Sequence, residues 1–152
     1  IAKQEISRKP LVAPVFRVAD TVFVDRKNQS KAIDALKPVV QTLRSGLSVA
    51  IAPEGTRSLG DRLGEFKRGP FHIAMQAGVP IVPIVIHNAS DVLPKGGFFI
   101  RPSRVVVDVL EPVSTESWKP ETVATHVREI RNMYLETLGQ TERAATELKR
   151  VK

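Results

Sequence analysis

Residues 47–58, Leu-Ser-Val-Ala-Ile-Ala-Pro-Glu-Gly-Thr-Arg-Ser, join an apolar run to a short polar turn. The run predicts a β-strand over Leu47–Ala52, because the proline and glycine that follow interrupt regular structure. Gly55 lacks a Cβ, so the backbone there can turn sharply or approach a ligand closely. Thr56 adds a hydroxyl, and Arg57 adds a planar set of donors that matches a phosphate or a carboxylate. By itself this stretch indicates either an anion-binding loop at the end of a strand or a surface turn with a solvated arginine.

The rest of the chain alternates between helical and strand-like patterns. Apolar residues recur at helical spacing, and a glycine follows within two residues, in Ser30–Arg44, Pro70–Ala77 and Pro120–Leu138. Apolar runs and alternation predict strands over Ile1–Glu5, Thr21–Asp25, Leu47–Ala52, Ile81–His87 and Arg104–Leu110. Pro38 predicts a kink or a later start in the first helix. Pro10–Ala19 is typical of a short apolar helix or turn, and Pro53–Arg68 of a long polar loop.

This alternation predicts an α/β fold with a mixed, mainly parallel sheet flanked by helices on both faces. In such folds, ligands bind where strands end in loops. Arg26 and the Glu54–Arg57 stretch both follow predicted strands, so we expect them on one rim of the sheet. One domain over residues 1–140, followed by a helix-prone polar tail over residues 141–152, accounts for the sequence.

The charge of the chain points to an anionic partner. Its 152 residues carry a formal net charge of +7, and the pI is near 10.1. Nucleic acid, anionic lipid and a phosphorylated substrate would each suit this charge. One Trp, one Tyr and six Phe offer few stacking platforms, so nucleic-acid binding is the weaker reading. Without cysteine there is no disulfide framework, and the longest apolar run, residues 79–86, is too short to span a bilayer.

Four segments, in this order, resemble the conserved blocks of the glycerolipid acyltransferase family. They are residues 22–26 (second block, G-x-x-F-I-D-R), 53–57 (third block, F-P-E-G-T-R), 66–69 (the basic F-K-x-G that follows) and 79–83 (fourth block, V-P-I-V-P). Asp20 and Ala52 replace the usual Gly and Phe at the edges of the second and third blocks. The resemblance extends over most of the chain, to about Leu138.

The resemblance implies a glycerol-phosphate-acyltransferase-like fold and an enzyme of phospholipid biosynthesis. Such an enzyme transfers an acyl group from acyl-CoA or acyl-carrier protein to the free hydroxyl of 1-acyl-sn-glycerol 3-phosphate. The implied partners are a lysophospholipid substrate, an anionic membrane surface and, as one candidate donor, acyl-carrier protein, with no nucleic acid. No metal and no cofactor beyond the acyl donor are expected. The expected location is peripheral, on the cytoplasmic face of a membrane, without a transmembrane segment in this chain.

The resemblance also assigns substrate-binding roles. Arg26 and Arg57 would clamp the acceptor phosphate through charge-assisted bonds. Glu54 would fix the loop or meet an acceptor hydroxyl, while Gly55 and Thr56 would offer a backbone N–H and a hydroxyl. Lys67, in the basic segment, belongs to the same candidate set. Alternatively, Arg26 solvates a turn beside Asp25, and Lys67 and Arg68 form a solvated face.

One block of the family, N-H-x-x-x-x-D, does not occur in the chain. His72 and His126 have no acid at the required spacing and are expected to be structural, and Asp91 comes one residue too early after His87. The catalytic His and Asp are therefore expected upstream of Ile1, in a longer protein of which this chain is an N-terminally truncated piece. A pseudoenzyme, or a non-catalytic anionic-lipid-binding module derived from the family, is the alternative.

Two apolar features leave alternatives open. Phe98-Phe99-Ile100, flanked by Lys95 and Arg101, fits a loop that dips into a lipid interface or a hairpin packed on its own core. Trp118, just before a predicted helix, fits a residue that packs on the helix start better than a membrane anchor.

Overall fold

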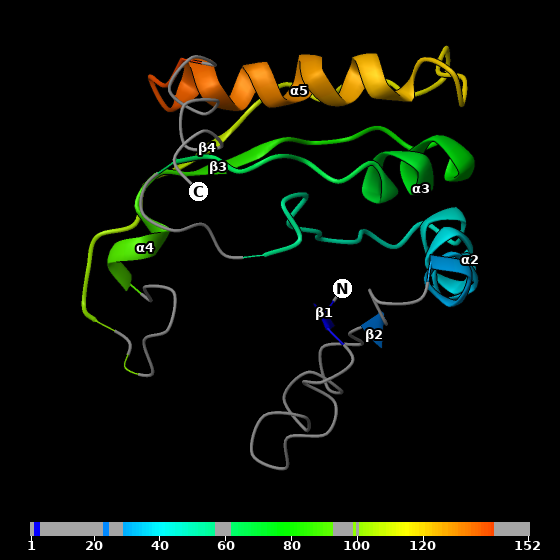
Figure 1. Ribbon diagram of the computed structural model, residues 1–152, viewed down its shortest axis with the longest axis horizontal. Helices are drawn as coiled ribbons and strands as arrows, with labels where there is room; N and C mark the ends of the chain where they lie inside the picture. The colour runs from blue at the N-terminus through cyan, green and yellow to red at the C-terminus, as the bar shows by residue number, and fades with distance from the viewer. Residues whose placement is uncertain are drawn as a thin grey trace.

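The computed structural model describes residues 2–3, 23–24, 29–56, 62–92, 99 and 101–141, with side chains from residue 37 onward. Its helices are α2 (Gln29–Arg44), α3 (Gly69–Ala77), α4 (Ala89–Val92) and α5 (Val123–Thr137). Its strands are β1 (Ala2–Lys3), β2 (Phe23–Val24), β3 (Ile84–Ile86) and β4 (Val107–Val109). Figure 1 shows α5, α3 and α2 one beneath another, with the β3–β4 pair beside α5. The predicted Pro10–Ala19 element and the tail beyond residue 141 lie outside the described residues.

The strands form two separate pairs. β1 and β2 are parallel, with Ala2 opposite Phe23, whereas β3 and β4 are antiparallel, with Val85 opposite Asp108. The expectation of a mainly parallel sheet is therefore wrong for the described part of the chain. The connection between β3 and β4 includes the short helix α4. After it, the chain returns beside β3 in the opposite direction, so that Ile86 pairs with Val107 and Ile84 with Val109.

The predicted strand over Leu47–Ala52 is also wrong. These residues lie outside every helix and strand of the structure, and no ladder hydrogen bond joins them to another described segment. Val49 and Ile51 still pack against the α2–α3 contact, so alternate side chains face inward as they would in a strand. Alternation of apolar residues indicates that one side of the segment is buried, but a β-strand also needs a hydrogen-bonded neighbouring strand.

Helix α2 contains Pro38 in its interior and begins at Gln29, so the later start considered for this helix is wrong. Val39 and Val40 on its inner face pack against Ile73 of α3. Helix α3 ends where predicted, because Gly78 adopts the left-handed conformation (φ 69°) and its N–H bonds back to the last turn. α2 and α3 therefore form one packed helix pair.

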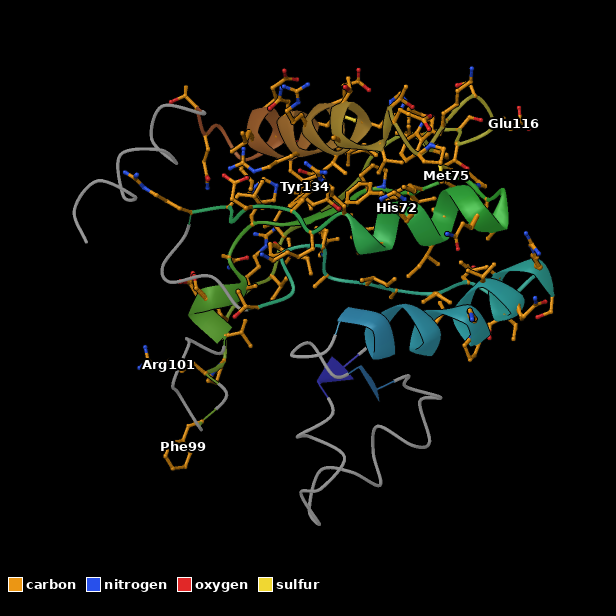
Figure 2. All side chains as sticks on the ribbon, turned by 45° about the vertical axis from the view of Figure 1, so that its right-hand side comes forward. His72, Met75, Phe99, Arg101, Glu116 and Tyr134 are labelled. Carbon is orange, nitrogen blue, oxygen red and sulfur yellow. The ribbon has the colours of Figure 1, made fainter. Side chains whose placement is uncertain are left out.

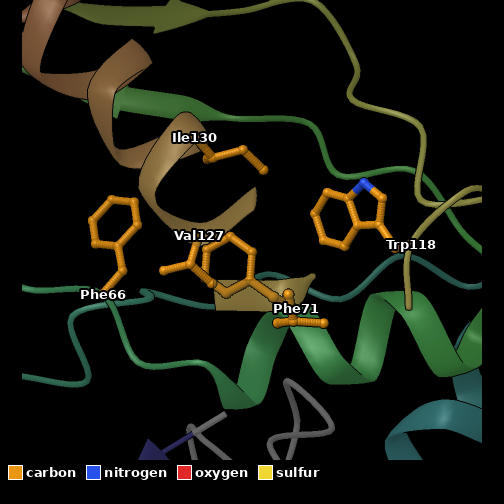
Figure 3. Close-up of a cluster of buried hydrophobic side chains, with 6 residues drawn as sticks. Phe66, Phe71, Trp118, Val127 and Ile130 are labelled. Carbon is orange, nitrogen blue, oxygen red and sulfur yellow. The ribbon is translucent and has the colours of Figure 1, made fainter. Parts of the chain in front are cut away.

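Helix α5 covers the main core. It begins at Val123, three residues after the predicted Pro120, because residues 120–122 form a turn. Its buried residues are Val123, Val127 and Ile130 of the apolar stripe, together with Arg131 and Leu135. The core cluster, drawn in Figure 3, consists of Phe66, Phe71, Trp118, Val123, Val127 and Ile130. Trp118 stacks on His126 with ring centroids 4.4 Å apart, so it packs on the first turns of α5.

The predicted strand over Ile81–His87 is only half buried. Pro83 and Val85 are buried, but Val82, Ile84 and Ile86 are 46%, 48% and 50% exposed. Helix α5 contacts this two-stranded pair through Tyr134 and Ile84, while alternate side chains of the β3 segment stay exposed. Among the described residues, no helix is long and apolar enough to cross a membrane.

Candidate functional site

The centre of the candidate site is the P-E-G-T turn, residues 53–56. The N–H of Gly55 donates to the carbonyl of Ala52 at 3.1 Å, which closes the turn. Gly55 has φ 68°, a conformation that favours glycine, so its predicted place in a sharp turn is confirmed. Glu54 is half-buried and Thr56 is exposed. The turn thus places Thr56 at the surface and keeps Glu54 partly inside the protein.

A second loop lies directly against this turn. We call residues 62–67 the bracing segment. The N–H of Lys67 donates to the carbonyl of Pro53 at 2.8 Å. A methyl group placed on Gly64 would lie 3.6 Å from Cγ of Glu54, so the Glu54 side chain rests over this glycine. The third block and the basic segment, separated in sequence, are therefore adjacent in space, and the Lys67 side chain is exposed beside them.

An aromatic pair anchors the bracing segment in the core. Phe66 is buried and meets Tyr134 of α5 edge-to-face, with ring centroids 5.1 Å apart. It also stacks on Phe71 of α3 at 6.2 Å. The Phe at the start of the F-K-x-G segment therefore has a structural role, since it fixes the adjacent Lys67 backbone to the core. Figure 2 shows Tyr134 directed from α5 toward the loops below it.

Tyr134 also connects α5 to strand β3. Its hydroxyl oxygen accepts a hydrogen bond from the N–H of Ile84 at 3.1 Å. Burial raises the pKa of Tyr134 above its ordinary value of 10.0; the Ile84 hydrogen bond opposes this rise, and the negative charge of Glu54 adds to it. The phenol is therefore neutral at physiological pH, and it lies close enough to Glu54 to sense its charge.

Two residues at this site were missed by sequence reasoning. Arg131 is buried on the inner face of α5, and its Nε donates to the carbonyl of Gly64 at 3.1 Å. Gln140, just after α5, accepts from the N–H of Leu63 through Oε1 at 3.0 Å. A signal for Arg131 was present, because it falls within the apolar stripe of the helix, where a cation is rarely buried without a partner. No comparable signal marked Gln140.

The two predicted phosphate-binding arginines, Arg26 and Arg57, lie outside the described residues. The structure therefore brings together Glu54, Gly55, Thr56 and Lys67 of the predicted site. The side chains of Lys67 and Arg68 are both exposed. Phe99 is 86% exposed, and its neighbours Phe98 and Ile100 lie outside the described part.

Two of the three histidines, His87 and His126, pair with side chains other than the aspartate that the catalytic block would require. Nε2 of His87 lies 2.7 Å from Oδ2 of Asp108, across the β3–β4 pair, so its acidic partner is on the neighbouring strand and is not Asp91. His126 stacks on Trp118, and its Nδ1 lies 2.8 Å from Oε2 of Glu129, which confirms a structural role. Within the described residues, no group of three or more His, Cys, Asp or Glu side chains could hold a metal ion.

Comparison with known proteins gives one family. The profile of the Acyltransferase family matches residues 1–87. Two similar relatives are the 1-acyl-sn-glycerol-3-phosphate acyltransferase of Limnanthes douglasii, 33% identical over 94% of this chain and 51% of that protein, and the alpha form of Mus musculus, 39% identical over 89% of this chain and 48% of that protein. The chain spans about half the length of the curated relatives it matches.

A solved structure shares the fold. It is the crystal structure of the 1-acyl-sn-glycerophosphate acyltransferase PlsC from Thermotoga maritima. The two chains are 29% identical, with a TM-score of 0.72 over 92% of this chain and 56% of the other. The PlsC structure therefore shares the arrangement of helices and small strand pairs described above.

Proposed function

The chain belongs to the Acyltransferase family, and on this premise we propose that its protein transfers an acyl group to the free hydroxyl of 1-acyl-sn-glycerol 3-phosphate. Identity of 33–39% to relatives that carry the name 1-acyl-sn-glycerol-3-phosphate acyltransferase supports this substrate. The observation that carries the proposal is the contact between the third block and the basic segment, through the Lys67 N–H and the Pro53 carbonyl. A non-catalytic lipid-binding module is not favoured, since these relatives bear an enzyme's name.

In the proposed reaction, the acceptor hydroxyl oxygen attacks the thioester carbon of acyl-CoA or acyl-carrier protein. The new C–O bond forms as the C–S bond breaks, and the hydroxyl proton leaves through a base while the thiol departs. By the family resemblance, the base would be the histidine of an N-H-x-x-x-x-D block, which this sequence does not contain. The residues of this chain would hold the acceptor in place, which can lower the barrier by several kcal/mol.

We place the acceptor phosphate beside the P-E-G-T turn. Arg26 and Arg57 would grip the phosphate oxygens through charge-assisted bonds. Thr56, an exposed residue of the turn, and Lys67, an exposed residue beside it, would add polar contacts, while the partly buried Glu54 would fix the loop from within. We further propose that residues 1–140 form the acyltransferase domain and that residues 141–152 are a separate polar tail.

Acyl transfer can be tested directly on the product of the full reading frame. We expect it to convert 1-oleoyl-sn-glycerol 3-phosphate and oleoyl-CoA to phosphatidic acid, measured by release of free thiol and by mass spectrometry of the lipid. The 152-residue chain alone should show no turnover above background, because none of its three histidines fits the catalytic block. Phosphatidic acid production by the chain alone would contradict the assignment of the base to that block.

We also propose that the protein works at an anionic membrane surface. The net charge of +7 supports an electrostatic attraction, and Phe99 and Arg101 supply an exposed ring beside an exposed cation. Figure 2 shows both side chains beyond α4, on the side of the molecule away from α3 and α5. An acceptor that is itself a lipid would reach the site most readily from such a surface.

Binding to liposomes should therefore depend on salt. We expect flotation with vesicles containing phosphatidylserine to fall as salt rises, because screening shortens the reach of exposed charges to about 8 Å at physiological ionic strength. Phe99→Ser should weaken binding at every salt concentration, since it removes the apolar part of the contact. Val107→Ser, at another exposed apolar side chain on β4, is the matched control. Equal binding to neutral and anionic vesicles would contradict the electrostatic contribution.

A further inference from the structure

We propose that the C-terminal half of α5 and the residues just after it position the P-E-G-T turn for the phosphorylated acceptor, through Arg131 and Tyr134 of the helix and Gln140 beyond it. This inference rests on the proposed function, and it assigns residues of the third-block site that lie beyond the segment matched by the family profile, residues 1–87. The argument follows a chain of contacts from the helix to the bracing segment and from there to the turn.

The bracing segment controls the turn at two points. Its last residue donates the Lys67 N–H to the Pro53 carbonyl at 2.8 Å, which fixes the entrance of the turn. Its Gly64 lies beside the stem of Glu54, because a Cβ added to this glycine would reach ordinary van der Waals distance from that stem. A shift of the bracing segment would therefore move both the backbone that precedes Glu54 and the side chain of Glu54.

Helix α5 and the residue position just after it hold the bracing segment at three points. Arg131 donates from Nε to the Gly64 carbonyl at 3.1 Å, and its guanidinium lies 3.9 Å from the Glu65 carboxylate. Gln140 accepts from the Leu63 N–H at 3.0 Å. Tyr134 meets Phe66 edge-to-face. Two residues of α5 and one residue after it thus contact the bracing segment from residue 63 to residue 66.

The burial of Arg131 shows that its position is specific. Arg131 is 6% exposed, and removing a guanidinium from water costs free energy unless the charge is hydrogen-bonded. An apolar residue would pack in the same stripe of α5 at lower cost. Arg131 instead directs its Nε–H at the Gly64 carbonyl of the bracing segment, and that segment lies against the third block.

The test uses variants of the full-length protein that keep the size of each side chain. Arg131→Met and Gln140→Met remove the donor and the acceptor, whereas Arg131→Lys and Gln140→Glu keep a charged donor and an acceptor oxygen. We expect each Met variant to raise the KM for 1-oleoyl-sn-glycerol 3-phosphate about tenfold, because a displaced turn would hold the acceptor less tightly and tenfold corresponds to about 1.4 kcal/mol of lost binding. The KM for oleoyl-CoA should stay near the wild-type value, and Gln140→Glu should recover most of the loss.

Val123→Ala supplies the control for a loss of stability alone. It lies on the same helix, is fully buried in the core and contacts neither loop through a hydrogen bond in the described residues. It should lower the melting temperature and leave both KM values unchanged, since the remaining folded molecules keep an intact turn. Met variants that behave like Val123→Ala would overturn the positioning role.

Amide hydrogen exchange separates this inference from the proposed function. In Gln140→Met we expect faster exchange at Leu63, Lys67 and Gly55, whose N–H groups are bonded in the wild type. If the wild-type protein shows no acyl transfer, the proposed function fails, and unchanged exchange at these amides would overturn the positioning role independently. Faster exchange with an unchanged acceptor KM would also overturn it, because the loop would then have moved without consequence for the acceptor.

Discussion

Replacing Arg57 with lysine is expected to lower kcat/KM for the phosphorylated acceptor by tenfold or more in the full-length protein. Lysine keeps the positive charge but loses the planar pair of donors that binds two phosphate oxygens at once. Cutting one end of a desolvated, hydrogen-bonded charge pair costs about 2–5 kcal/mol, and about 1.4 kcal/mol corresponds to a factor of ten. The loss should appear chiefly as a raised KM for the acceptor, with the KM for the acyl donor nearly unchanged.

A second arginine permits a stricter test of this phosphate clamp. Arg26→Ala should have a similar effect, and the double variant should lose less than the sum of the two single losses if both residues bind one phosphate. Arg128→Lys, on the exposed side of α5, is the matched control and should change neither constant. If Arg57 only braces its loop, the variant should instead lower the melting temperature and harm donor and acceptor equally. An unchanged acceptor KM would remove Arg57 from the site.

Phe71→Ala is expected to produce the largest loss of stability, about 3–5 kcal/mol in the free energy of unfolding. Phe71 is 3% exposed and joins α3 to the core cluster through Phe66, which also anchors the bracing segment. The substitution removes a buried ring and leaves a cavity between α3 and α5, as Figure 3 makes clear from the position of Phe71 among its neighbours. Urea denaturation followed by far-UV circular dichroism measures the change.

The exposed Phe99 gives the matched control for this stability measurement. Phe99 is 86% exposed, so Phe99→Ala should shift the free energy of unfolding by no more than about 0.5 kcal/mol. A comparable loss in both variants would show that ring size, and not burial, governs the result. A loss below about 1 kcal/mol in Phe71→Ala would contradict the packing described for the core, because removing a buried phenylalanine ring lowers the free energy of unfolding by more than this.

The helices were predictable from sequence because their determinants are local. An apolar stripe at a spacing of three to four residues and a following glycine need only neighbouring residues to act. α2, α3 and α5 accordingly lie at or within three residues of their predicted starts. The glycine of the P-E-G-T turn was predictable for the same reason, since its left-handed conformation is imposed by the turn itself.

The strands were less predictable, because a strand is defined by a partner that the local sequence does not name. Leu47–Ala52 has the composition of a strand, but within the described residues it has no ladder. The antiparallel pairing of β3 with β4 depends on the path between them, which overturned the expected mainly parallel sheet. The half-exposure of β3 likewise depends on what packs against each of its faces.

The sequence by itself determined the family resemblance, the three long helices and the chemical character of the P-E-G-T turn. Only the tertiary structure decided that Glu54 lies near Tyr134, 80 positions later, and that Arg131 and Gln140 hold the loop beside it. The physical reason is the range of the interactions. Helix periodicity and turn conformation arise within a few residues, whereas a buried guanidinium or a loop amide finds its partner only after distant elements have packed.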